Sequence, residues 1–295
     1  MTLNNVHCYF RVMGLQEKIF VLCLLVLCCH CQDLYISPSG NNTDTCSQED
    51  PCGNVQTALN VFSTNTQSSL VLVITDGVYS GDYNTNIVFP PVPSSIIGQG
   101  ATIQCSVFDF DHFGFHTVSN FSITGDLLFS GCYTSINATG DASLSLSGVS
   151  FTSKYSNVSS VFGTQASAAL LFDNVNGTVT ISGGNVQQCD LGFLVYNAKS
   201  VYIHLTTFVG ITYIPIEVTI TVESAKIESV TVRSSGASVL YAVFGQPRII
   251  TNCTFDSSIH GALSLLGGYW KLENLIVQNS YSATTNTGGI YIDQG

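Results

Sequence analysis

The sequence predicts an all-β fold built as a parallel β-helix, a solenoid in which short strands stack coil upon coil. Apolar and small polar residues alternate in many short runs, such as Ile249–Phe255, and successive side chains of a strand leave opposite faces. The same phrase recurs about every 22–24 residues, with one longer step of 35. A fixed period in this range, with strands and almost no helix, is typical of stacked repeats.

The repeat becomes visible when the apolar residue that ends the first strand of each phrase is aligned. These residues are Phe129, Phe151, Val186, Phe208, Val232, Phe255 and Val277. A second series advances by 23 residues at each step and consists of Leu194, Glu217, Leu240 and Leu263. We expect the coils to run in register from Phe113 onward. Because one repeat cannot bury its own apolar face, the stack is the unit of stability.

Composition supports strands joined by uncharged turns. The chain is 45% hydrophobic and only 9% charged, whereas helical bundles carry Lys and Glu on their outer faces. The formal net charge is −11, with only 8 Lys and Arg in total. Such a chain has no basic surface to neutralise phosphates, which excludes nucleic acid as a partner.

The first residues have the pattern of a secretory leader. The apolar run Ile19–Cys29 follows the positively charged Lys18 and is too short for the about 20 residues of a membrane span. We therefore interpret residues 1–31 as a signal peptide, with a signal-anchor as the alternative. Met1 and Met13 are both candidate start sites.

The mature chain is expected to have two parts. Residues 32–68 hold a strand, a Cys loop and a helix over Gly53–Phe62, and residues 69–295 form the β-helix. One face of that helix carries the apolar residues Val55, Ala58, Leu59 and Phe62. Since the helix immediately precedes the stacked strands, it is expected to cap the first coil.

Six cysteines remain after the leader, which permits disulfides in a secreted protein. Cys46 and Cys52 share one Pro-containing loop and are predicted to be paired. The other four, Cys105, Cys132, Cys189 and Cys253, lie at repeat-equivalent places, where they are either paired or small buried hydrophobes.

Six N-x-S/T sequons point to glycosylation in the secretory pathway. They begin at Asn41, Asn120, Asn137, Asn157, Asn176 and Asn252.

Several phrases resemble a known superfamily. The order L-Y-I-S-P-S-G (34–40), Cys loop, helix, D-G-V-Y (76–79) and I-I-G-Q-G-A-T-I-Q-C (96–105) resembles right-handed parallel β-helix proteins of the pectin-lyase-like superfamily. The phrases H-G-A-L (260–263) and G-G-I-Y (288–291) are similar to those of polymorphic outer-membrane-type repeats and protist cell-surface β-helix proteins. The resemblance covers about residues 33–295 and implies a right-handed, single-stranded solenoid.

The same resemblance argues against inherited catalysis. Members that cleave polyuronides need a carboxylate cluster on one strand face with a nearby Arg or Lys. Here Asn42-Thr43-Asp44 lies outside the coils, and Arg248-Ile249-Ile250 lacks the lysine of the hydrolase phrase. We therefore expect no catalytic residues, no cofactor and no metal.

Three sets of residues are weaker candidates for a binding site. Asp109, Asp111, His112 and His116 could hold a cation, or form a solvated turn. Glu217, Glu223 and Glu228 are separated by six and five residues and need not converge. Tyr202, Tyr213, Tyr241, Tyr269 and Trp270 could form an aromatic strip for stacking on sugar rings, or be ordinary sheet-surface residues.

The sequence thus predicts a non-catalytic glycoprotein module, extracellular or on the cell surface, with a structural, adhesive or carbohydrate-recognising role. Its expected partners are extracellular carbohydrate or another surface protein. The alternative is a divergent polysaccharide lyase or glycoside hydrolase acting on acidic polysaccharide. Convergence of Asp109, Asp111 or the three glutamates with a base in one groove would distinguish the two.

The carboxyl end reads as an incomplete stack. Gly288–Ile292 looks like the opening strand of another coil, and no amphipathic cap follows it. We expect either a longer surface protein or self-association through this end.

Overall fold

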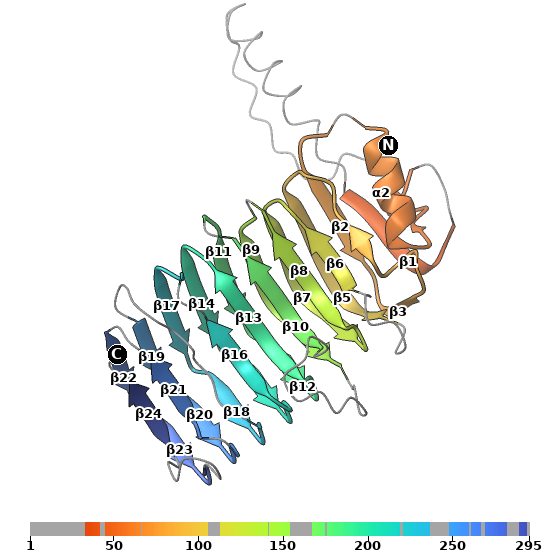
Figure 1. The fold of residues 1–295 in the computed structure, drawn as a ribbon. Helices are drawn as coiled ribbons and strands as arrows, with labels where there is room; N and C mark the ends of the chain where they lie inside the picture. Colours follow the sequence, from red (N-terminus) through yellow and green to blue (C-terminus); the bar gives the residue numbers. More distant parts are fainter. Residues whose placement is uncertain are drawn as a thin grey trace, which may run out of the picture. The chain divides into compact units, whose positions relative to one another are not determined.

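The protein is a parallel β-solenoid, which confirms the predicted fold class (Figure 1). The computed structural model describes residues 33–41, 45–65, 67–105, 113–140, 142–153, 167–174, 176–218, 221–236, 248–259, 261–266, 269–281 and 289–293. The unit Met1–Gln32, with the predicted leader, lies outside them, and the solenoid belongs to the unit Asp33–Gly295.

The strands of the solenoid form three sides, which we name sheet 1, sheet 2 and sheet 3. Sheet 1 contains β1 (Asp33–Asn41), β2 (Leu70–Ile74), the first halves of β5 (Ser94–Gln104), β7 (Phe121–Ser130) and β9 (Leu144–Thr152), then β11 (Thr178–Ser182), β14 (Ser200–His204), β17 (Ser224–Glu228), β19 (Arg248–Thr251) and β22 (Trp270–Glu273). Sheet 2 contains β3 (Gly77–Ser80), the second halves of β5, β7 and β9, then β12 (Asn185–Gln187), β15 (Thr207–Val209), β18 (Thr231–Arg233), β20 (Thr254–Asp256) and β23 (Ile276–Gln278). Sheet 3 contains β4 (Ile87–Val88), β6 (Phe113–Thr117), β8 (Thr134–Thr139), β10 (Ala168–Asp173), β13 (Leu191–Asn197) and β16 (Ile214–Val218). A further parallel pair joins β21 (Leu263–Leu266) to β24 (Ile290–Asp293).

The coils are held in register by columns of apolar residues, one from each coil. The sheet 1 column consists of Leu34, Leu72, Ile96, Ile123, Leu146, Ile181, Ile203, Ile227, Ile250 and Leu272. The expected register from Phe113 onward is confirmed, and the same register extends back to β1. The strands of the early coils are aligned in the same way, although loops of unequal length connect them.

The predicted repeat series is one column of sheet 2. Ile103, Phe129, Phe151, Val186, Phe208, Val232, Phe255 and Val277 pair in that order, including across the 35-residue step. In the second predicted series, Leu194 pairs with Glu217, whereas Leu263 pairs with Ile290 and Leu240 lies outside the described residues.

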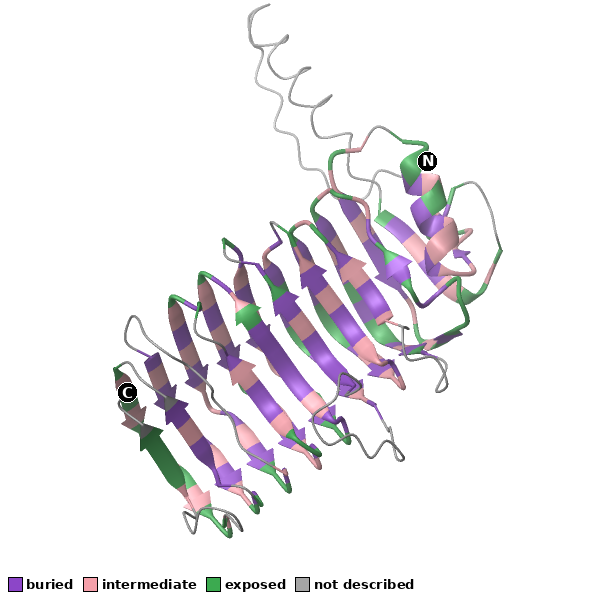
Figure 2. Cartoon of the chain, viewed as in Figure 1, coloured by how far each residue is buried: buried purple, intermediate pink, exposed green. Residues whose placement is uncertain are grey.

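Aromatic rings fill the space between sheets 2 and 3. Phe129 of sheet 2 lies with its ring centroid 5.0 Å from that of Phe115 in sheet 3 and 5.6 Å from that of Phe151. Phe193 continues the series, with its centroid 5.0 Å from that of Phe208. These side chains are fully buried, and buried residues run along the strands from coil to coil (Figure 2). This packing makes the interior a continuous core.

The chain turns between sheets through single residues in the left-handed conformation. Leu205, Ser229, Asn252 and Asn274 make the corner from sheet 1 to sheet 2, with φ between 52° and 55°. The backbone amides of Leu205, Ser229 and Asn252 donate to the next coil, as from Asn252 to the Glu273 carbonyl at 3.0 Å. The corner is therefore satisfied by hydrogen bonds even where the residue is not glycine.

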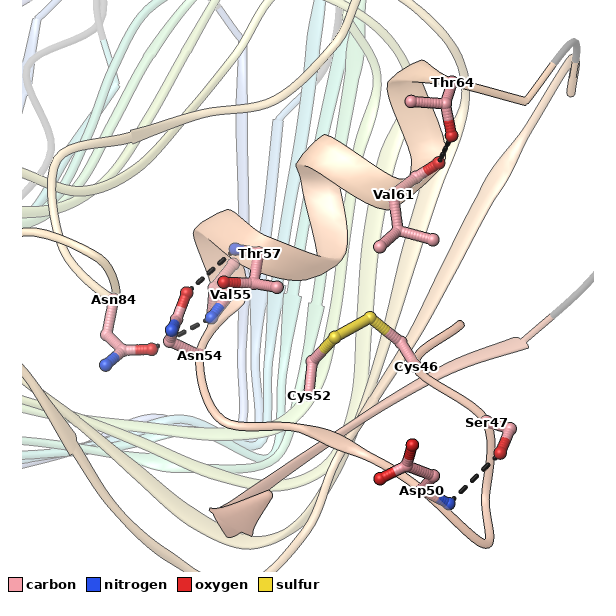
Figure 3. Close-up of a disulfide and its surroundings, with 10 residues drawn as sticks. All are labelled: Cys46, Ser47, Asp50, Cys52, Asn54, Val55, Thr57, Val61, Thr64 and Asn84. Atoms are coloured by element: carbon pink, nitrogen blue, oxygen red, sulfur yellow. Dashed lines mark hydrogen bonds between the residues drawn. A yellow bond between two sulfur atoms is a disulfide. The ribbon is translucent and has the colours of Figure 1, made fainter. Parts of the chain in front are cut away.

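The predicted helix is present as α2 (Val55–Ser63) at the β1 end of the solenoid (Figure 1). The side chain of Asn54 accepts a hydrogen bond from the Thr57 amide at 2.8 Å and caps the first turn (Figure 3). The predicted apolar face is the buried one: Val55, Ala58, Leu59 and Phe62. The helix contacts β1, as expected for a cap.

Two disulfides are present in the described residues. Cys46 and Cys52 are joined as predicted, in the loop before α2 (Figure 3). The second joins Cys105 to Cys132 on successive coils and settles a pairing that the sequence left open. Cys189 and Cys253 are buried thiols, and burial raises the pKa of Cys189 to about 12.

The last described coil is more exposed than the others. Ile276 of β23 is 55% exposed, and Ile290 and Ile292 of β24 are 42% and 48% exposed. The expected opening strand is present as β24, while self-association stays a prediction. Among the described residues, no helix has the length and apolarity needed to cross a membrane.

Candidate functional site

The outer face of sheet 1 carries the most regular array of polar side chains. Alternation along each strand places every second residue on this face, and two columns of these residues run from coil to coil. One column contains Val71, Ser95, Ser122, Ser145, Thr180, Tyr202, Lys226, Ile249 and Lys271. The other contains Tyr35, Val73, Ile97, Thr124, Ser147, Ser182, His204, Glu228, Thr251 and Glu273. Hydroxyls dominate the middle coils, and charged groups follow in later coils.

A groove of about 410 Å³ lies over the hydroxyl-bearing part of this face, and we name it the hydroxyl groove. Ser95, Ser122, Ser145 and Thr180 line it at one per coil, together with Asn120 immediately before β7. The lining residues carry no charge. Neighbouring strands lie about 4.8 Å apart, so the residues that carry the hydroxyls form a ladder with that backbone spacing.

Hydrogen bonds between coils hold the groove in shape. The Ser95 and Ser122 hydroxyl oxygens lie 2.7 Å apart. Asn120 Oδ1 accepts the Ser143 amide at 3.0 Å, and Ser143 Oγ accepts the Thr178 amide at 3.1 Å. The polar groups are therefore pre-ordered, which lowers the entropy lost when a ligand binds.

A second hollow of about 480 Å³ adjoins the first, because both use strands β2 and β5. Tyr35, Val73 and Ile97 line it, together with Thr75 and Gln99. It offers an aromatic ring and aliphatic surface beside the hydroxyl ladder.

Beyond the groove lies a cluster of ionisable side chains on β14 and β17. Glu228 Oε2 accepts hydrogen bonds from Lys226 Nζ at 2.7 Å and from the Tyr202 hydroxyl at 2.8 Å. Lys226 Nζ also lies 5.2 Å from the centre of the Tyr202 ring, and the His204 ring stacks on that of Tyr202 at 5.6 Å. The four groups form one network.

The network stabilises the charged forms of its ion pair. The hydrogen bond to Glu228 raises the pKa of Lys226, and hydrogen bonds from Lys226 and Tyr202 lower the pKa of Glu228. The hydrogen bond to Glu228 also raises the pKa of Tyr202. A general acid or base works best with a pKa near the operating pH, and all three shifts lead away from neutrality. This arrangement favours positioning a polar ligand over transferring protons.

Of the acidic and histidine candidates, only His116 and the three glutamates belong to the described residues, and these do not form one cluster. Asp109, Asp111 and His112 lie outside the described residues. His116 is half-buried on the outer face of sheet 3, where its Nδ1 has no hydrogen-bond partner among the described residues. The three glutamates are dispersed, because Glu217 lies on sheet 3, where burial raises its pKa, Glu223 precedes β17, and only Glu228 joins the network.

The predicted aromatic strip is not formed as one surface. Tyr202 and Trp270 belong to sheet 1, whereas Tyr213 precedes β16 of sheet 3. Tyr269 is 79% exposed next to Trp270, and Tyr241 lies outside the described residues. The Trp270 ring instead lies 5.4 Å from the guanidinium of Arg248.

Four of the predicted glycosylation sites are exposed: Asn41, Asn120, Asn176 and Asn252. Asn137 is half-buried with its Oδ1 enclosed, and Asn157 lies outside the described residues. Asn120 is distinctive because it lines the hydroxyl groove.

Sequence reasoning missed the hydroxyl groove. Its signal was a Ser or Thr one residue before the inward aliphatic residue of sheet 1 in four successive coils, as Ser122 stands before Ile123. The described residues contain no group of three or more metal-ligating side chains. No protein family matches the chain, and no curated protein is significantly similar to it.

Proposed function

We propose that this protein is a glycoprotein module of the cell surface or extracellular space that binds an extended, uncharged carbohydrate along the outer face of sheet 1. The hydroxyl groove is the observation that carries the proposal. Ser95, Ser122, Ser145 and Thr180 offer donors and acceptors in a row, without a charged group among them. A sugar chain presents hydroxyls of the same kind along its length.

The groove is suited to a saccharide in its volume and in the residues that line it. Its volume of about 410 Å³ falls within the range of small-ligand sites. Val71 and Pro93 add apolar surface to its lining, and Tyr35 in the adjoining hollow provides a ring for stacking. Binding would then combine many modest contacts, as befits an adhesive or structural role.

Secretion is part of the same proposal. Two disulfides, in a chain whose leader pattern and exposed sequons point to the secretory pathway, suit an oxidising compartment. We further propose a relationship to the right-handed β-helix proteins of the pectin-lyase-like superfamily, in particular to the non-catalytic repeats of surface proteins, on the strength of the phrases at 34–40 and 96–105.

The enzymatic alternative rests on the network of Tyr202, Lys226 and Glu228. If it acted on acidic polysaccharide, the protein would cleave polygalacturonate, and Glu228→Gln would abolish the cleavage. We expect no cleavage, with or without Ca²⁺, because the pKa shifts hold Glu228 ionised and Lys226 protonated.

A glycan array tests the binding proposal. The probe is unglycosylated protein exported to an oxidising bacterial compartment, so that both disulfides form and the groove carries no glycan of its own. We expect it to bind neutral oligosaccharides in preference to acidic ones, because the groove lining is uncharged. Binding of acidic glycans alone, or of none, would contradict the proposal.

A further inference from the structure

Asn120 is both the first residue of a glycosylation sequon and a residue that lines the hydroxyl groove. The residue is exposed, lines the groove and stands immediately before β7. Its sequon is completed by Ser122, which is itself a member of the hydroxyl ladder and lies against Ser95. A glycan on Asn120 therefore begins inside the groove.

The side chain of Asn120 is held in place by its neighbour. Oδ1 accepts the Ser143 amide at 3.0 Å, and Asn120 O accepts the Ser94 amide at 2.9 Å. Because Oδ1 is the engaged atom, Nδ2 is left for attachment of the sugar. The other exposed sequons differ in this respect, since none of their asparagines is among the groove residues.

We propose that the N-glycan on Asn120 lies in the hydroxyl groove and closes it to outside glycans. This inference rests on the proposed function, because the groove must accept sugars. It also names a ligand class, the N-acetylglucosamine and mannose core of N-glycans. The sugars would contact residues that line the hydroxyl groove, among them Ser145 on the coil that follows Asn120.

Tethering makes such closure effective even when the intrinsic affinity is weak. A ligand on a short tether has an effective concentration of about 1 mM. If the N-glycan core binds the hydroxyl groove with a Kd of about 0.1 mM, the glycan tethered at Asn120 weakens binding of a free glycan about tenfold. Removing the glycan at Asn120 should therefore raise the affinity of the groove for free glycan by the same factor.

The experiment uses the full chain from a eukaryotic secretory host and free Man₃GlcNAc₂ pentasaccharide as the probe. Asn120→Gln removes the glycan in the groove and keeps an amide, while Asn252→Gln removes a glycan from the corner between β19 and β20. We expect Asn120→Gln to bind the pentasaccharide about tenfold more tightly than wild type in calorimetry, and Asn252→Gln to match wild type. Adding Ser145→Arg to Asn120→Gln should abolish that gain.

A second measurement follows the attached glycan itself. Glycopeptide mapping after a timed glycosidase digest of native protein should show slower release at Asn120 than at Asn252. Ser145→Arg should remove the difference by displacing the glycan. If Asn120 carried no glycan, or if its glycan were released as fast as that of Asn252, the inference would be overturned.

The two proposals fail in different ways. If unglycosylated protein binds oligosaccharides but wild type and Asn120→Gln bind the pentasaccharide equally, only the closure by the Asn120 glycan is wrong. If unglycosylated protein binds no oligosaccharide, the proposed function is wrong. If the glycosidase also releases the glycans of Asn120 and Asn252 at the same rate, the closure of the groove by the Asn120 glycan is wrong as well.

Discussion

Replacement of Phe129 by alanine is expected to lower the free energy of unfolding by about 3–5 kcal/mol. The ring is fully buried and contacts the rings of Phe115 and Phe151 on two sides. The Phe129 ring is tightly packed. A Cβ atom added to Gly114 would lie only 2.9 Å from the Phe129 Cδ1 atom. The alanine would leave a cavity in the middle of the solenoid, where the neighbouring coils cannot close it.

Leu128→Ala is the matched control, since the preceding residue of β7 lies on the outer face. We expect it to change stability by no more than about 1 kcal/mol. Denaturant unfolding of both variants, with the slope of the transition compared, provides the measurement. Equal destabilisation by the two changes would contradict the assignment of Phe129 to the core.

Removal of the Cys105–Cys132 disulfide is expected to cost about 3–4 kcal/mol. The bond closes a loop of sequence separation 27 and links the coils of β5 and β7. Changing both residues to alanine avoids an unpaired thiol. Denaturant unfolding of the double variant against wild type, under non-reducing conditions, measures the difference.

Cys189→Ala serves as the control for this change. It removes a buried thiol that makes no disulfide, and should cost only about 1 kcal/mol. If wild type under reducing conditions were as stable as under oxidising conditions, the account of this bond would be wrong.

The fold could be predicted because inward residues keep their chemistry from coil to coil. Phe129, Phe151 and Phe208 occupy equivalent inward positions of sheet 2, where burial favours apolar side chains. The capping helix was predictable for the same reason, since its four apolar residues share one face. Apolar residues recur once per coil because they are buried, and this recurrence is what predicts the fold.

The hydroxyl groove on the outer face of sheet 1 could not be predicted from the sequence in the same way. Ser95, Ser122, Ser145 and Thr180 are separated by 27, 23 and 35 residues, so their alignment depends on loops of unequal length. Outward residues are also free to differ between coils, as Thr180 is followed in its column by Tyr202. Only the strand register reveals the ladder.

The same limit applies to the pairing of cysteines and charges. Cys105 and Cys132 resemble Cys189 in sequence context, and the structure shows that only the first two meet. Glu228 was grouped with two other glutamates by its spacing, whereas its partners are Lys226 on its own strand and Tyr202 on the preceding coil. Contacts across coils depend on geometry that spacing along the chain does not contain.

The most direct test of the account is a calorimetric titration of unglycosylated protein with the neutral oligosaccharide that the array ranks highest. Two variants are compared, each with one arginine on an exposed, outward position: Ser145→Arg in the hydroxyl groove and Gln104→Arg on sheet 2. We expect Ser145→Arg to abolish the heat of binding and Gln104→Arg to leave it unchanged. Full binding by Ser145→Arg, or equal loss in both variants, would contradict the claim that the hydroxyl groove is the carbohydrate site.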